Sequence, residues 1–181
     1  MRRAFREIVK KLVQAAVLLG CLAASAGWAT TLERLSLDEM IQKSTAIVRG
    51  SVTSMTAHQR GSIIYQQAQI RVVERFKGSG GGVVDVVVPG GTLNGVRQTF
   101  SGTPQLSPGT EYVFFLWTGP RGSTQIIGLA QGVLNLKLDA KGNAQVQRAA
   151  ITEGVGTSID AIAMSLDSLR TRIQRVTGAR E

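Results

Sequence analysis

The clearest pattern in the chain is a regular alternation of apolar and polar residues in its middle part. In residues 63–78, "IIYQQAQIRVVERFKG", Ala68, Ile70 and Val72 alternate with two glutamines and an arginine. This period of two predicts a long strand with one buried side and one solvent-facing side. The adjacent apolar pair Val72 and Val73 shifts the phase, so we expect a bulge or bend near Val73.

Several further strands are predicted by short apolar runs that end at glycine, proline or polar turns. A polar turn is expected at residues 55–62, and the weakly patterned residues 90–109 predict a long loop. Residues 124–139 are expected to form one bent strand, or two short strands hinged near Gly128 and Gly132. The other predicted strands are residues 46–55, 83–89, 111–117 and 144–148.

A short helix is predicted before the strands, at residues 36–44. Ser36 followed three residues later by Glu39 is a capping box, which marks a helix start. Apolar residues at helical spacing then predict the buried side of this helix. They are Leu37, Met40 and Ile41.

A second helix is predicted at the C-terminus, where apolar residues recur at intervals of three and four. Ser158 would cap its start, and Asp160 would lie at the positive end of its dipole. We expect this amphipathic helix to pack on the strands, and a coiled-coil-like contact with a partner is the alternative. The apolar seam consists of Ile159, Ile162, Leu166, Leu169, Ile173 and Val176.

Together these elements predict a mainly β fold, namely a small OB-like β-barrel with a short N-terminal helix and a C-terminal amphipathic helix. A chain of 181 residues is long enough for one such domain behind an N-terminal signal. The expected boundaries are a signal peptide at residues 1–29, the β-barrel domain at residues 30–150, and the amphipathic helix, packed on the barrel, at residues 151–181.

The first 29 residues have the three parts of a secretory signal peptide. Basic residues come first, an apolar run follows, and small residues end it, with cleavage expected after Ala26 or Ala29. Polar and glycine residues interrupt the apolar run, which argues against a membrane-spanning anchor. We therefore expect a periplasmic or secreted protein.

Cys21 provides a lipid-anchored alternative. The stretch "LLGC", residues 18–21, resembles a bacterial lipobox, in which the cysteine is acylated and becomes the first mature residue. The simpler interpretation is that Cys21 is a small apolar residue of the signal peptide. Contact with a membrane is expected only if Cys21 is lipidated. A twin-arginine signal is a further alternative, since "RRAF" at residues 2–5 resembles half of one.

The charge of the chain changes if the signal peptide is removed. The full sequence has 21 basic and 12 acidic residues, a net charge of +9. Residues 1–29 hold five of the bases and one of the acids, so 16 bases and 11 acids remain, a net charge of +5. This moderate positive charge suits an exported protein near an anionic envelope and is weak support for nucleic-acid binding.

The residues give little support for an enzyme or for a cofactor-binding protein. The glycine run after Lys77 precedes a valine-rich strand, whereas a phosphate-binding loop needs a helix there. His58 is the only histidine and Cys21 the only cysteine, so a zinc site would need mostly carboxylate ligands. Asp85 stands alone inside an apolar strand, and no G-x-S-x-G motif is present. We expect no enzyme, no cofactor and no metal site.

Nucleic-acid binding is also not expected. OB-fold proteins that bind single strands stack bases on exposed aromatic side chains beside a basic groove. The aromatic residues here mostly fall on strongly apolar strands, where they predict core packing. They are Tyr65, Phe76, Phe100, Tyr112, Phe114, Phe115 and Trp117.

The order of several short motifs resembles a known group of proteins. "STAIVRGSVTSM", "IIYQQAQIRVVERFKG", "VDVVVPGG", "PGTEYVFFLW" and "IIGLAQGVLNL" are similar to segments of exported bacterial proteins of uncharacterised function. More distantly they resemble the netrin-like domain of the tissue inhibitors of metalloproteinases. That resemblance implies a five-stranded OB barrel with flanking helices over residues 36–138. It also implies protease inhibition as an alternative function, although the N-terminal cysteine and the disulfides of those inhibitors are missing here.

The predicted loop between Gly90 and Gly109 is the candidate site. Arg97 and Phe100 lie within it, and long ordered loops of barrels often carry function. The alternative is that Arg97 is merely solvated and Phe100 is held by the core. We therefore expect a non-enzymatic binding module whose partner is another envelope or secreted protein.

Overall fold

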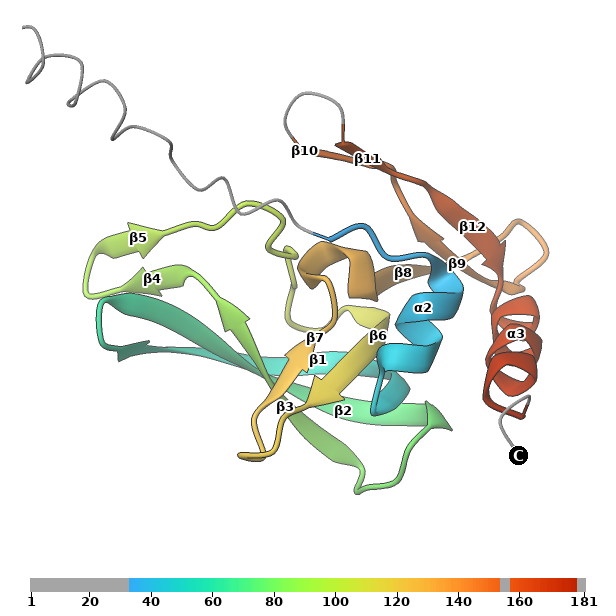
Figure 1. Ribbon diagram of the computed structural model, residues 1–181, viewed down its shortest axis with the longest axis horizontal. Coiled ribbons are helices and arrows are strands. Elements are labelled where there is room, and N and C mark those ends of the chain that lie inside the picture. Colours follow the sequence, from blue (N-terminus) through green and yellow to red (C-terminus); the bar gives the residue numbers. More distant parts are fainter. Residues whose placement is uncertain (1–32, 154–156, 179–181) are drawn as a thin grey trace, which may run out of the picture. The chain divides into compact units, whose positions relative to one another are not determined.

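A computed structural model of the chain describes residues 33–153 and 157–178, and these form a mainly β structure with two α-helices (Figure 1). The predicted signal peptide at residues 1–29, Cys21 included, lies outside the described residues. Within the described residues, neither helix is long and apolar enough to span a membrane.

Eight strands form the main sheet. In spatial order they are β1 (Ala46–Arg60), β2 (Ile63–Lys77), β3 (Val83–Pro89), β7 (Thr124–Ile126), β6 (Glu111–Thr118), β8 (Val133–Leu138), β9 (Ala144–Arg148) and β12 (Ile162–Ser165). Two small two-stranded sheets stand apart from it in the pairing pattern: β4 (Gly91–Leu93) with β5 (Val96–Gln98), and β10 (Ile151–Glu153) with β11 (Thr157–Ile159).

The first part of the main sheet returns on itself. Strand β6 pairs with β7 and also with β1, so hydrogen-bonded pairings run from β1 through β2, β3, β7 and β6 back to β1. These pairings are antiparallel except that of β3 with β7, which is parallel at Val87 and Gln125. Most residues of one buried apolar cluster come from these five strands.

The expected bulge in β2 is confirmed. Arg49 pairs with Glu74 while Gly50 pairs with Val72, so Val73 has no partner in the register. Gly50 lies where β1 crosses this irregularity, and a Cβ there would come within 2.5 Å of the carbonyl oxygen of Arg71. The bulge thus requires a residue without a side chain at position 50.

The predicted polar turn at residues 55–62 is wrong for most of its length. Strand β1 continues to Arg60, and only Gly61 and Ser62 form the turn. The predicted turn residue His58 therefore lies on a strand, opposite Tyr65, with the two rings stacked at 6.1 Å between centroids. Pairing with the long strand β2 satisfies the backbone of this polar stretch, so its low hydrophobicity does not end the strand.

Other sequence predictions for the strands agree with the structure. Residues 124–139 form two strands, β7 and β8, joined by the 3-10 helix η1 (Leu129–Gly132), as one of the two alternatives stated. Gly128, at the hinge, has a φ of 59°, which favours glycine. The glycine run after Lys77 is the turn between the antiparallel strands β2 and β3.

Helix α2 (Leu37–Lys43) matches its prediction closely. The backbone N–H of Glu39 donates to the hydroxyl of Ser36 at 3.2 Å, and the N–H of Ser36 donates to the carboxylate of Glu39 at 2.8 Å. Both halves of the capping box are therefore present. The buried residues of the helix are Leu37, Met40 and Ile41, as the pattern predicts.

The C-terminal helix, α3 (Leu166–Gly178), begins later than predicted. Residues Ile162–Ser165 are strand β12, which pairs with β9, so the prediction of a helix from Ser158 is wrong. The hydroxyl of Ser165 accepts the N–H of Ser168 at 3.1 Å and takes the capping role assigned to Ser158. The free edge of β9 provides backbone partners that a helix start would lack, and this outweighs the helical spacing.

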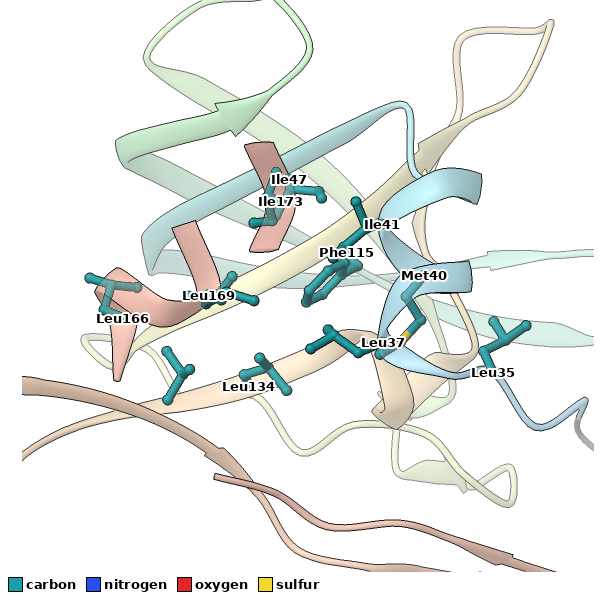
Figure 2. Packing of buried hydrophobic residues seen from close by; sticks show 12 residues of the cluster. Leu35, Leu37, Met40, Ile41, Ile47, Phe115, Leu134, Leu166, Leu169 and Ile173 are labelled. Atoms are coloured by element: carbon teal, nitrogen blue, oxygen red, sulfur yellow. The ribbon is translucent and has the colours of Figure 1, made fainter. Parts of the chain in front are cut away.

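Strand β6 is buried on both faces. Tyr112, Phe114 and Leu116 belong to a core cluster shared with β1, β2 and β3, whereas Val113 and Phe115 belong to a second cluster. Figure 2 shows Phe115 among side chains of α2 and α3. From the two helices this second cluster contains Leu37, Met40, Ile41, Leu166, Leu169 and Ile173.

Candidate functional site

The predicted loop at residues 90–109 contains a small β-hairpin made of β4 and β5 (Figure 1). Asn94 and Gly95 form its turn, with φ angles of 49° and 78°. Two successive residues with positive φ are typical of the tight hairpin turns that Asn-Gly sequences favour. The prediction of a long loop without strands is therefore wrong for residues 91–98, and the Asn-Gly pair was the local signal that could have revealed the hairpin.

The hairpin is attached to the start of strand β2. The side chain of Gln98 accepts the N–H of Ile64 at 2.7 Å and donates to the carbonyl oxygen of Ser62 at 2.8 Å. The N–H of Gly90 donates to the carbonyl oxygen of Ile64 at 2.8 Å. Gly91 lies so close to Gln66 that a Cβ would come within 2.7 Å of its side chain. These contacts hold the hairpin in place against β2.

A cavity of about 280 Å³ lies between the hairpin and the residues that follow it. Arg97 and Phe100, the two residues singled out from the sequence, both line it, so the structure brings them together. The residues around it are Met55, Gln66, Pro89, Gly90, Gly91, Thr92, Arg97, Gln98, Thr99, Phe100, Thr103, Pro104, Gln105 and Leu106.

Arg97 is the charged residue of this cavity. Among the described residues that line it, no other side chain is an acid or a base. Arg97 is exposed, and within residues 33–153 and 157–178 its guanidinium has no hydrogen bond or ion pair. A guanidinium presents five N–H donors in a planar fork, so this side chain can bind a carboxylate without breaking an internal contact.

Phe100 is neither free in solvent nor fixed in the core. Its side chain remains 39% exposed, and its ring lies near Gly90, where a Cβ would come within 3.6 Å of Cδ2. The ring is therefore partly supported by the backbone and partly available to a ligand. An aromatic ring in this position offers a large apolar contact with few rotatable bonds.

A second, more apolar cavity of about 190 Å³ adjoins the first. Pro89 and Pro104 line both cavities, and Tyr65 lines the second. The remaining residues around the second cavity are Val87, Val88, Gln125, Ile126 and Leu129. Together the two cavities offer a cation, an aromatic ring and an apolar recess, which suit the binding of a ligand.

The other residues considered from the sequence lie elsewhere. Asp85 is exposed on β3, and its cross-strand neighbour is Gln69. His58 stacks on Tyr65 on the hairpin of β1 and β2. Among residues 33–153 and 157–178, no group of three or more histidine, cysteine, aspartate or glutamate side chains could hold a metal ion.

No protein-family model matches this chain, and a search of curated proteins finds no match. A function for this chain must therefore be argued from its own residues. Arg97 and Phe100, the candidate residues from the sequence, line one cavity, and their role stays a prediction.

Proposed function

We propose that this protein is an exported, non-enzymatic binding module of the bacterial envelope or exterior, and that it holds another protein at the cavity of Arg97 and Phe100. The observation that carries the proposal is the position of an unpaired guanidinium beside a half-exposed aromatic ring. Arginine and aromatic residues are enriched among the residues that contribute most to protein–protein binding. Arg97 lies on the anchored hairpin and Phe100 follows directly after it, which supports binding with little rearrangement.

An OB-like barrel is part of this proposal. The closed series of pairings from β1 through β2, β3, β7 and β6 back to β1 supports it, as does the parallel pairing of β3 with β7. The apolar cluster of Val48, Ile70, Val86 and Phe114 would then be the interior of the barrel. In OB-like proteins the loops between strands bind ligands, and the β4–β5 hairpin is such a connection.

Export is supported by the sequence of residues 1–29 and places the partner in the periplasm, the envelope or the exterior. Lipidation at Cys21 is the alternative to cleavage after Ala26 or Ala29, and it would attach the module to a membrane. N-terminal sequencing and intact mass of the purified mature protein separate these outcomes.

The partner surface that fits Arg97 and Phe100 carries a carboxylate next to an apolar side chain. An acidic group would form a charge-assisted hydrogen bond with the guanidinium. An apolar side chain beside it would cover the ring of Phe100 and enter the recess lined by Pro89 and Pro104. The absence of other ionisable side chains around the described part of the Arg97 cavity favours a partner with one acid at this point.

The test is capture of envelope proteins by the purified mature protein, followed by an affinity measurement with the captured partner. We expect the double variant Arg97→Glu with Phe100→Ala to weaken binding at least about 10-fold, because it reverses the charge and removes the ring. Arg121→Glu, on the exposed turn after β6, is the matched charge control and should bind as the wild type does. Equal binding by the double variant, or no captured protein, would contradict the proposal.

The strand order also favours the runner-up function, a protease-inhibitor-like or protease-associated protein. The support is the resemblance to netrin-like inhibitor domains together with the β1–β2–β3–β7–β6 pairing series. Those inhibitors chelate the protease zinc with an N-terminal cysteine, and Cys21 could take that place only with a free amine. Inhibition of a co-exported metalloprotease by the mature protein would promote this function over the first.

A further inference from the structure

A third cavity, of about 530 Å³, lies on the helix side of the sheet and shares no residue with the two cavities of the hairpin. Its volume falls within the range of about 300–1,000 Å³ that is usual for small-molecule sites. It is lined by the segment that enters α2, by the residues around β12, and by single residues of β9 and α3. These are Arg34, Leu35, Ser36, Leu37, Glu39, Arg148, Asp160, Ala161, Ile162, Ala163, Met164 and Arg172.

Arg148, at the end of β9, is the buried cation of this cavity. Only 6% of its surface is exposed, and its guanidinium bonds only to uncharged atoms. One terminal nitrogen donates to the carbonyl oxygen of Gln131, and the other donates to the carbonyl oxygen of Asp160 at 2.9 Å. Nε has no partner in the described part of the chain. Burial lowers the pKa of Arg148 from its ordinary value.

The other charged side chains around the cavity already have partners. The carboxylate of Asp160 pairs with Arg34, and the carboxylate of Glu39 accepts bonds from Ser36. Arg172 donates to Asp38 at 2.7 and 3.1 Å. Asp160 attracts Arg148 from a distance, but no carboxylate in the described residues bonds to it. Among the described residues, the charge of Arg148 therefore has no bonded counter-ion.

Burying Arg148 without a bonded counter-ion costs free energy of folding, and a purely structural role would not offset that cost. Buried charges in proteins are normally paired, because removing a guanidinium from water costs far more than removing a neutral donor. The two carbonyl groups that Arg148 binds could be satisfied by a neutral amide side chain at lower cost. A buried, unpaired cation that lines a cavity is instead typical of a site for an anion.

We infer that this cavity binds a monocarboxylate attached to an apolar group, with the carboxylate at Arg148. The apolar group would lie against Leu37, Ile162 and Met164, which also line the cavity. A carboxylate fits the planar fork of a guanidinium and can accept its remaining N–H donors. The charged side chains that line the cavity are three arginines and two acids, a sum of +1, which matches a monoanion better than a dianion such as phosphate.

Two sources could supply this chemistry: the C-terminal carboxylate of a peptide that ends in an apolar residue, and a free carboxylic acid with a short alkyl chain. The first test is a titration of the purified protein followed by amide NMR. The probes are octanoate, octanamide, and a short acetylated peptide ending in leucine as its free acid and as its amide. We expect at least one acid to shift the resonances of the cavity residues and to bind at least about 10-fold more tightly than its amide.

The second test removes the cation. Arg148→Met keeps an apolar side chain of similar length and should weaken binding of the acid at least about 10-fold, while Arg148→Lys should retain part of it. Arg34→Gln is the matched control, because Arg34 lines the same cavity but is exposed and paired. It should change the affinity less than about 3-fold. Arg97→Glu should have no effect, since it lies in the other cavity.

A variant that leaves the guanidinium intact covers the case in which Arg148→Met does not fold. Ala163→Phe places a ring at an exposed lining residue and should block the acid without touching Arg148. The inference is overturned if the amides bind as tightly as the acids, or if the acid binds Ala163→Phe unchanged. It is also overturned if no acid shifts the spectrum at about 10 mM, well above the Kd of about 1 mM of a weak site.

Discussion

The two faces of strand β6 are buried by different means. On one face Tyr112, Phe114 and Leu116 pack among strands, and every buried member of that cluster is apolar. On the other face Val113 and Phe115 pack under α2 and α3 (Figure 2). Among the described residues, three buried polar side chains adjoin that second cluster. These are Ser44, which donates to the carbonyl oxygen of Met40, Gln131, which bonds to Leu35, and Arg148, which contacts Met40.

The difference follows from how the backbone is satisfied on each side. Strands on the first face pair with one another, and this pairing satisfies most of their N–H and C=O groups, apart from places such as the start of β2, where the side chain of Gln98 accepts the N–H of Ile64. The second face is covered by α2 and α3 and by the segment that leads into α2, residues 33–36, which has no ladder partner. The side chain of Gln131 bonds to two backbone groups of the segment before α2. It accepts the N–H of Leu35 at 2.9 Å and donates to the carbonyl oxygen of Glu33 at 2.9 Å. Arg148 bonds to two further carbonyl groups.

The largest expected effect compares the two faces directly. Phe114→Ala and Phe115→Ala each remove a fully buried ring, so each should lower the free energy of unfolding by about 3–5 kcal/mol. Urea unfolding monitored by circular dichroism measures both. Phe100→Ala, which removes a half-exposed ring, is the control and should cost less than about 1 kcal/mol. A similar cost for Phe100 and either core phenylalanine would mean that the two clusters are not the stabilising cores.

A smaller effect is expected for Gln131, a buried polar side chain on the face of β6 that α2 and α3 cover. Gln131→Leu keeps the volume but leaves the N–H of Leu35 and the carbonyl group of Glu33 without their partner. Leaving the buried N–H of Leu35 unsatisfied costs about 1–3 kcal/mol, whereas the carbonyl group of the exposed Glu33 can bond to water, so we expect a loss of about 1–3 kcal/mol in urea unfolding. Gln67→Leu, at an exposed position of β2, is the matched control and should change stability by less than about 0.5 kcal/mol. Equal stability of the two variants would show that these bonds do not support the helix side.

The strand side of this comparison was largely predictable because its signals are local. Alternation in β2, the phase shift at Val73 and the apolar run of β6 can each be read within about ten residues. The capping box at Ser36 is equally local. The extension of β1 to Arg60 was missed because pairing with β2, and not the polarity of the segment, decides where that strand ends.

The elements on the face of β6 that α2 and α3 cover were less predictable, because they depend on contacts between residues far apart in the sequence. The seam that begins at Ile159 fits a helix, but residues Ile162–Ser165 find a partner in β9 and become a strand. Apolar Ile162 and Met164 also satisfy a period of two, so the pattern alone does not decide between the two structures. Competition from a free strand edge can be recognised only when the tertiary arrangement is known.

The cavity of Arg97 and Phe100 and the cavity of Arg148 differ in the same respect, namely how far apart in the sequence their key residues lie. Arg97 and Phe100 lie three residues apart in one segment, so sequence reasoning could place them together. Gln131 and Arg148 come from separate elements, and Gln131 contacts a residue 96 positions away in the chain. No pattern around Arg148 distinguishes it from a solvent-facing arginine on a polar strand. Its burial and its missing counter-ion are properties of the fold.

The smallest expected effect concerns the ion pair that links the two helices on this side. The Arg172 guanidinium donates to Asp38 and lowers the pKa of that carboxyl from its ordinary value, near 3.8. A carboxyl whose pKa is lowered on folding contributes its stability above the unfolded pKa and loses it as the pH falls through the folded pKa. The pair is half exposed, so its contribution should be under about 1 kcal/mol.

A double-mutant cycle with Asp38→Asn and Arg172→Gln isolates this pair from the other carboxyls that titrate in the same range. We expect a coupling free energy that is constant from about pH 8 to pH 5 and falls as the pH is lowered below about pH 4, from the unfolded pKa towards the lower folded pKa of Asp38. Urea unfolding at each pH measures it. A coupling free energy near zero at about pH 7 would mean that the two helices are joined by packing of residues such as Leu37 and Ile173, and not by the charge of Asp38.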